Sequence, residues 1–161
     1  MSSGCCGGDT SCASTPVEVS GSGCPTCGRV GKTVARTTVS ALTRGLVAPH
    51  QDFRLCREPA CPTVYYGSLG SLFGVNDMHV VPGFKEGSEG WVCYCYHHSL
   101  RSLERELRET GESTVVAEIT AEVQAGNCAC DVRNPTGKCC LGEVQRALRH
   151  LAQETSQTAA G

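Results

Sequence analysis

The sequence predicts an α+β protein with a β-rich first half and a second half built from three helices. Between Gly21 and about Gly90 it is rich in Gly, Pro and β-branched residues, which favour short strands and turns. After Trp91, apolar residues recur at helical spacing. The chain of 161 residues also contains 13 cysteines and 19 glycines, and its 40% of hydrophobic residues includes those cysteines. A core this thin needs covalent or metal cross-links.

Four segments follow from the composition. Residues 1–20 form a flexible Cys-containing tail, because they hold almost no large apolar side chains. Residues 21–88 form the β-rich subdomain, and residues 89–155 the helical subdomain, with the boundary in the Gly-, Ser- and charge-rich stretch Lys85–Gly90. Residues 156–161 form a disordered polar tail. Short strands are expected at Thr33–Ser40, Thr63–Tyr66 and His79–Val81.

The three helices are expected from apolar residues three and four positions apart. Ser99 and Ser113 can cap the first two helices, and Gly111 and Gly126 can end them. The apolar positions are Leu100, Leu103 and Leu107 in the first helix, Val116, Ile119 and Val123 in the second, and Leu141, Val144, Leu148 and Leu151 in the third.

Charge and hydropathy exclude several classes of function. The net charge of −2 and the 5% of aromatic residues argue against a nucleic-acid-binding protein. No apolar stretch approaches the length of a membrane span. Met1–Thr15 lacks the basic and apolar regions of a secretory signal, so we expect a cytoplasmic protein with reduced thiols. No catalytic triad or carboxylate pair stands out, and we expect no enzymatic site.

Four cysteines of the first half have the spacing of a zinc site. The sequence Cys24-Pro25-Thr26-Cys27-Gly28 places two thiolates three positions apart, on a tight turn that Pro and Gly favour. A second pair, Cys56 and Cys61, follows after enough chain for a hairpin. Four thiolates would close the coordination sphere of Zn²⁺, so the site is expected to be structural. Reduced thiols without a metal are the alternative.

A second group of cysteines flanks the helices. Cys93-Tyr94-Cys95 precedes them, and the other members lie between the second and third helices: Cys128, Cys130, Cys139 and Cys140. The turn sequence Asn134-Pro135-Thr136-Gly137 delivers the last two to the start of the third helix, where backbone N–H groups favour an anion. An iron–sulfur cluster held by thiolates is such an anion. A second zinc is the alternative, although the C-x-C spacing favours a cluster.

These motifs resemble the N-terminal domain of CopZ-type copper chaperones over about residues 22 to 150. Cys24-Pro25-Thr26-Cys27 and Cys56 to Cys61, followed by Val64-Tyr65-Tyr66, look like its mononuclear zinc part. Cys93-Tyr94-Cys95 and the segment Cys130 to Cys140 look like its [2Fe-2S] module. The helical half is also similar to bacterioferritin-associated ferredoxin, which has C-x-x-C where this chain has nine residues between Cys130 and Cys140.

The resemblance implies a ligand set for each metal group. For zinc it implies Cys24, Cys27, Cys56 and Cys61, and for the [2Fe-2S] cluster it implies Cys93, Cys95, Cys130 and Cys140, with Cys139 as the alternative to the last. It also implies a role in copper binding, reduction or delivery, with the cluster supplying electrons or sensing redox state. A copper-transporting ATPase or a separate copper-loop chaperone, and a redox partner, are the implied partners.

The sequence departs from full-length chaperones of this type in one respect. Neither of its methionines, Met1 and Met78, precedes the M-x-C-x-x-C loop that carries copper in that family. The tail thiols Cys5, Cys6 and Cys12 are a candidate substitute site for Cu(I), because soft thiolates on a Gly-rich segment suit that ion. An electron carrier serving a reductase, or a scavenger of mercury or arsenic, are the alternative functions.

Overall fold

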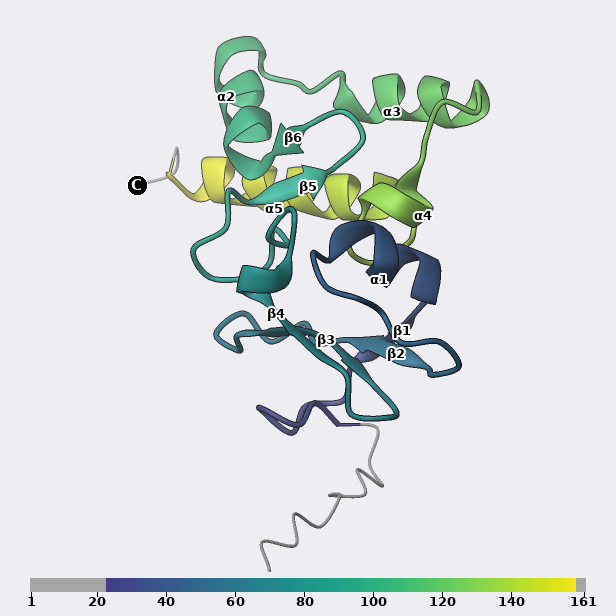
Figure 1. The fold of residues 1–161 in the computed structure, drawn as a ribbon. Helices are drawn as coiled ribbons and strands as arrows, with labels where there is room; N and C mark the ends of the chain where they lie inside the picture. Colours follow the sequence, from purple (N-terminus) through teal and green to yellow (C-terminus); the bar gives the residue numbers. More distant parts are fainter. Residues whose placement is uncertain (1–22, 159–161) are drawn as a thin grey trace, which may run out of the picture.

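The computed structural model describes residues 23–158, and within this range an antiparallel sheet is followed by a helical half (Figure 1). The sheet has the order β1-β2-β3-β4, so each strand pairs with the next in the chain. Its strands are β1 (Lys32–Val34), β2 (Phe53–Leu55), β3 (Thr63–Gly67) and β4 (Leu72–Gly74), and a short 3₁₀ helix η1 (Val75–Asp77) follows. The predicted α+β class and the strand at Thr63–Tyr66 are confirmed.

Helix α1 (Arg36–Leu42) overturns the predicted strand at Thr33–Ser40, because the strand ends at Val34 and the chain turns into a helix. The β-branched run Thr37, Thr38, Val39 suggested a strand. Thr38, Val39 and Leu42 are buried on one face of the helix, and this tertiary packing outweighs the weak helix propensity of the run.

The segment His79–Val81 is also not a strand. Met78 makes an isolated bridge with Thr43, and the backbone N–H of His79 donates to the carbonyl of Leu42 at 2.9 Å. Beyond this point the chain continues as an irregular loop to β5 (Trp91–Cys93), and the pairing with the end of α1 is too short to extend into a ladder.

The helical half contains the three predicted helices as α2 (Leu100–Thr110), α3 (Val115–Gln124) and α5 (Leu141–Thr158). The short strand β6 (His98–Ser99) pairs with β5, and a one-turn helix α4 (Cys130–Arg133) was not predicted. Ser99 caps α2 as expected, with its hydroxyl accepting from the N–H of Ser102 at 3.2 Å. The N-cap residue of α3 is Thr114, whereas the sequence predicted Ser113, one position earlier. Gly111 and Gly126 follow α2 and α3 with positive φ.

Two apolar cores lie on either side of α1, which sits between the sheet and the helices (Figure 1). The core of the first half is Val34, Val39, Leu42, Phe53, Leu55, Val64, Tyr65, Phe73 and Met78. The core of the second half contains four cysteines beside ordinary apolar residues: Cys93, Cys95, Leu103, Val115, Ile119, Cys130, Cys140 and Val144. The cysteines therefore occupy positions that large apolar residues fill in other proteins.

Polar contacts join the two halves at several points. The Thr38 hydroxyl donates to the carbonyl of Asp131 at 2.6 Å, and the Tyr65 hydroxyl donates to the carbonyl of Pro135 at 2.7 Å. A partly buried ion pair, at 2.9 Å, links Arg57 to Glu143 in the first turn of α5. The predicted boundary between residues 88 and 89 stays a prediction. The predicted tail 1–20 lies outside the described residues, as does part of the tail 156–161.

Candidate metal centres

The first metal centre brings together two loops at one end of the sheet. Cys24 and Cys27 flank a tight turn, in which the N–H of Gly28 donates to the carbonyl of Cys24 at 2.7 Å and Gly28 has a φ of 74°. Cys56 follows β2 directly and is fixed by a backbone bond from its N–H to the carbonyl of Val64, at 2.8 Å. Cys61 precedes β3 by two residues.

The geometry of this centre fits zinc. The sulfur atoms of Cys24, Cys27, Cys56 and Cys61 all lie within 4.8 Å of one another. The Sγ atoms of Cys27 and Cys56 are 3.6 Å apart, and those of Cys24 and Cys61 are 3.9 Å apart. A tetrahedron with zinc–sulfur bonds of about 2.3 Å has sulfur–sulfur edges of about 3.8 Å. The predicted residues thus form a zinc site of four cysteines, and Cys27 is the least buried of them.

The four thiols of the zinc site differ in acidity. Burial tends to raise the pKa of Cys24, but hydrogen bonds from the backbone of Cys27 and Thr26 outweigh it and bring that pKa down to about 7. Burial raises the pKa of Cys56 to about 12 and also raises the pKa of Cys61. Four thiolates at neutral pH therefore require a bound cation, which is the work that Zn²⁺ does in such sites.

A second cysteine cluster lies in the core of the helical half. Cys93 ends β5, Cys130 begins α4, and Cys140 directly precedes α5. The Sγ atoms form two close pairs, Cys93 with Cys140 at 3.0 Å and Cys95 with Cys130 at 3.6 Å. All four residues are at most 9% exposed. This arrangement of buried thiols is compatible with another metal centre.

The remaining cysteines of this region lie apart from the two pairs. Cys139 is exposed, whereas its neighbour Cys140 is only 1% exposed and contacts Cys93. Cys128 is partly buried, and its thiol donates to the hydroxyl of Tyr96 at 3.8 Å. Burial and contact thus favour Cys140 over Cys139 as the fourth member of the cluster, while the assignment of ligands stays a prediction.

Asn134 organises the turn that carries Cys139 and Cys140. Its side chain is 1% exposed, and its amide oxygen accepts from the N–H and the hydroxyl of Thr136 at 3.0 and 2.9 Å. Its amide nitrogen donates to the carbonyl of Lys138 at 2.8 Å. The sequence predicted the turn but not this role of Asn134. The sequence Asn-Pro-Thr-Gly could have indicated this role, because Asn side chains commonly bond to the backbone of such turns.

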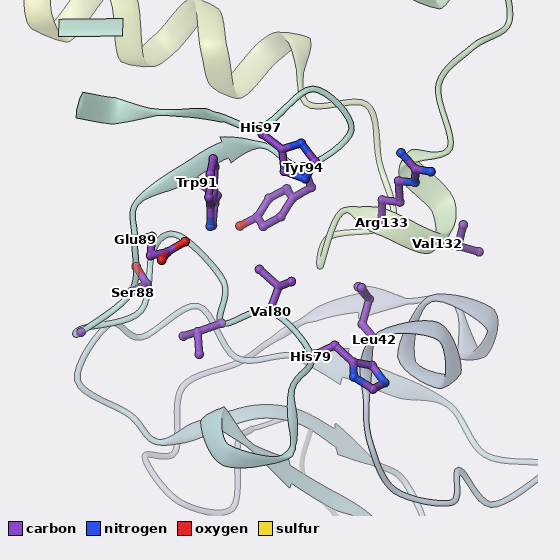
Figure 2. Close-up of a pocket in the computed structure, with 12 residues that line it drawn as sticks. Leu42, His79, Val80, Ser88, Glu89, Trp91, Tyr94, His97, Val132 and Arg133 are labelled. Carbon is purple, nitrogen blue, oxygen red and sulfur yellow. The ribbon is translucent and has the colours of Figure 1, made fainter. Parts of the chain in front are cut away.

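A cavity of about 780 Å³ lies between the two halves (Figure 2). Tyr94, the middle residue of the C-x-C segment, lines it together with Trp91 and His97. The rest of the wall is mixed: apolar Leu42 and Val80, basic Arg133 and acidic Glu89 all contribute to it. Its volume lies within the range of small-molecule sites.

Among residues 23–158, no helix combines the length and apolarity needed to cross a membrane.

Comparisons with known proteins agree with this arrangement. A family model described as "Zinc binding domain" matches residues 21–79. The copper chaperone CopZ of Archaeoglobus fulgidus is 31% identical over 126 residues, which are 76% of this chain and 60% of the length of that relative. The X-ray structure of the N-terminal domain of A. fulgidus CopZ is 32% identical and superimposes with a TM-score of 0.62, covering 77% of this chain and 95% of that domain. The chain therefore belongs to the family of CopZ N-terminal domains.

Proposed function

We propose that this chain is a metal-handling redox protein that carries a structural zinc and a [2Fe-2S] cluster and assists in copper binding, reduction or delivery. The observation that supports the cluster is the two close contacts between buried thiols, Cys93 with Cys140 and Cys95 with Cys130. The copper role is supported by the relative that is named a copper chaperone. The zinc at Cys24, Cys27, Cys56 and Cys61 has no position left for a substrate, so we assign it to the fold.

The residues of the helical half suit a [2Fe-2S] cluster. Two pairs of thiolates, Cys93 with Cys140 and Cys95 with Cys130, match a group that needs four thiolate ligands. The start of α5 lies directly after Cys140, where unpaired backbone N–H groups and the helix dipole favour a bound anion. Burial of the four cysteines keeps water away from the group. A bound cluster would supply a one-electron redox centre, which is the chemistry that conversion between Cu(II) and Cu(I) needs.

Metal analysis of the whole chain tests the cluster. Protein purified without oxygen should contain about two iron, two sulfide and one zinc per chain. Cys140→Ser should lose the iron, whereas the matched variant Cys139→Ser should keep it, because only the first residue is buried against Cys93. Zinc without iron in the wild type after anaerobic reconstitution would rule out the cluster.

The copper site is proposed to lie in the tail rather than in the folded body. The cysteines of the two metal centres cannot bind Cu(I) without losing their own metal, so the tail thiols Cys5, Cys6 and Cys12 remain as soft ligands, together with Cys128 and Cys139. Deletion of residues 1–20 should abolish tight Cu(I) binding and leave the visible spectrum of the cluster unchanged. Tight binding that survives the deletion would place the copper site in the folded body. For the copper-handling role, the proposed partners of this chain are a copper-transporting ATPase or a separate copper-loop chaperone.

A plain electron carrier is the second candidate. A [2Fe-2S] cluster alone would be sufficient for this role, because it carries single electrons. If neither the whole chain nor the deletion variant binds Cu(I) tightly while the cluster is present, the electron-carrier role is preferred. A protein without iron whose tail binds Hg(II) or As(III) tightly would point instead to a soft-metal scavenger.

A further inference from the structure

Lys85 is a buried lysine beside the zinc site, with only 2% of its surface exposed. Its ammonium group donates to three backbone carbonyls: Glu58 at 2.7 Å, Cys61 at 3.0 Å and Thr63 at 2.7 Å. A lysine ammonium has three protons to donate, so all its hydrogen bonds are made within the protein. Buried lysines are rare because losing hydration is costly, and one so fully bonded points to a specific role.

The three carbonyls belong to the chain that forms one side of the zinc site. Glu58 lies inside the loop between Cys56 and Cys61, and Thr63 begins β3 directly after it. The backbone N–H of Glu86 adds a fourth bond, to the carbonyl of Pro59 at 3.1 Å. The segment around Lys85 therefore holds the loop at its middle and at its end.

The charge of Lys85 also suits this position. Zinc bound by four thiolates carries a double negative charge, which is unfavourable in a buried site without a nearby cation. Other charged groups around the loop are already paired: Arg57 with Glu143, and Arg29 with Glu58. The ammonium group of Lys85, in contrast, donates to backbone carbonyls, which carry no compensating negative charge.

We propose that Lys85 is a positioning residue of the zinc site, which holds the Cys56–Cys61 loop closed around the metal and offsets the negative charge of its thiolates. The proposal rests on the zinc site alone, so it does not depend on the cluster or on copper. Loss of the bonds around metal ligands commonly weakens metal binding about 10- to 100-fold.

The first test compares zinc release to an excess of a chromophoric chelator. Lys85→Met should release zinc about 10- to 100-fold faster than the wild type, whereas Lys85→Arg should recover only part of the difference, because it keeps the charge but its planar guanidinium does not reproduce the three ammonium bonds. Lys138→Met is the matched control, since it removes the same charge from an exposed side chain in the helical half. The thiolate absorption bands of Co(II)-loaded protein should shift only in Lys85→Met. Zinc release and Co(II) spectra like those of the wild type in Lys85→Met would overturn the proposal.

A second test uses the wild-type protein and decides the matter even if Lys85→Met does not fold. The chain has three lysines, Lys32, Lys85 and Lys138, which mass spectrometry distinguishes after acetylation of the native protein. Lys32 and Lys138 are exposed and should react with or without zinc. Lys85 should be protected in the zinc-loaded protein and become reactive after chelation. Equal reactivity of Lys85 in both states, whether high or low, would contradict a role tied to the metal.

Discussion

The hydroxyl of Tyr65 offers the sharpest test of how the two halves depend on each other. Tyr65 lies in β3 and is fully buried, and its hydroxyl donates to the carbonyl of Pro135 at 2.7 Å. Pro135 belongs to the turn that leads to Cys139 and Cys140. The variant Tyr65→Phe removes one oxygen atom and leaves the shape of the ring intact, so it isolates this contact between the sheet and the turn.

The expected cost follows from the buried acceptor. A carbonyl that loses its hydrogen-bond donor away from water costs about 1–3 kcal/mol of unfolding free energy. For a chain of this size, each kcal/mol lowers the melting temperature by about 2–4 °C. Tyr65→Phe should therefore lower Tm by about 2–12 °C.

Urea unfolding at fixed zinc content measures this cost, with far-UV circular dichroism and the fluorescence of Trp91, the single tryptophan, as probes. Tyr96→Phe is the matched control, because the hydroxyl of Tyr96 bonds to Glu122 at 3.2 Å within the helical half and is nearer to solvent. We expect the control to lose less stability than Tyr65→Phe, because water can replace the lost partner at a part-buried carboxylate but not at the buried carbonyl of Pro135. A Tyr65→Phe variant no less stable than Tyr96→Phe would refute the inference that this hydroxyl couples the halves.

Three further predictions concern the metal centres. Cys24→Ser should leave the first half poorly folded, and a circular dichroism melt like that of the wild type with zinc absent would show that zinc is not structural. At pH 8, zinc binding should release at least two protons, because the pKa values of Cys56 and Cys61 are raised above this pH. The apparent affinity for zinc should therefore fall as the pH falls. Zinc titrations in weak buffer at several pH values measure both effects. Asn134→Ala should reduce the iron content after reconstitution, since the turn loses its bonds to the carbonyl of Lys138 and to Thr136; unchanged iron would argue against this role.

The elements that sequence predicts well are those specified by neighbouring residues. The three long helices follow from apolar residues three and four positions apart, and Ser99 and Gly111 mark the ends of the first of them. The zinc residues are similarly readable, since a C-x-x-C turn and a second cysteine pair define most of the site within two short segments.

The features that sequence did not predict depend on distant partners. Helix α1 contains a run of β-branched residues, and only its burial between the sheet and α4 favours a helix there. Lys85 reads as a charged residue in a Gly- and Ser-rich linker, yet it lies 24 residues from Cys61, whose carbonyl it contacts. No local pattern distinguishes such a lysine from an exposed one.

Polar contacts connect the zinc site with the buried cysteine cluster across the predicted boundary between the two halves. Arg57 lies inside the loop between two zinc residues, and its ion pair reaches Glu143, which is three positions after Cys140. On the other side, the N–H of Gly83, two residues before Lys85, donates at 2.7 Å to the hydroxyl of Tyr94 within the C-x-C segment. The loop that zinc orders is thus connected to both ends of the cysteine cluster. Because polar contacts between ordered segments cost less entropy than contacts between mobile ones, we expect zinc in the first site to stabilise the cysteine cluster without contacting it.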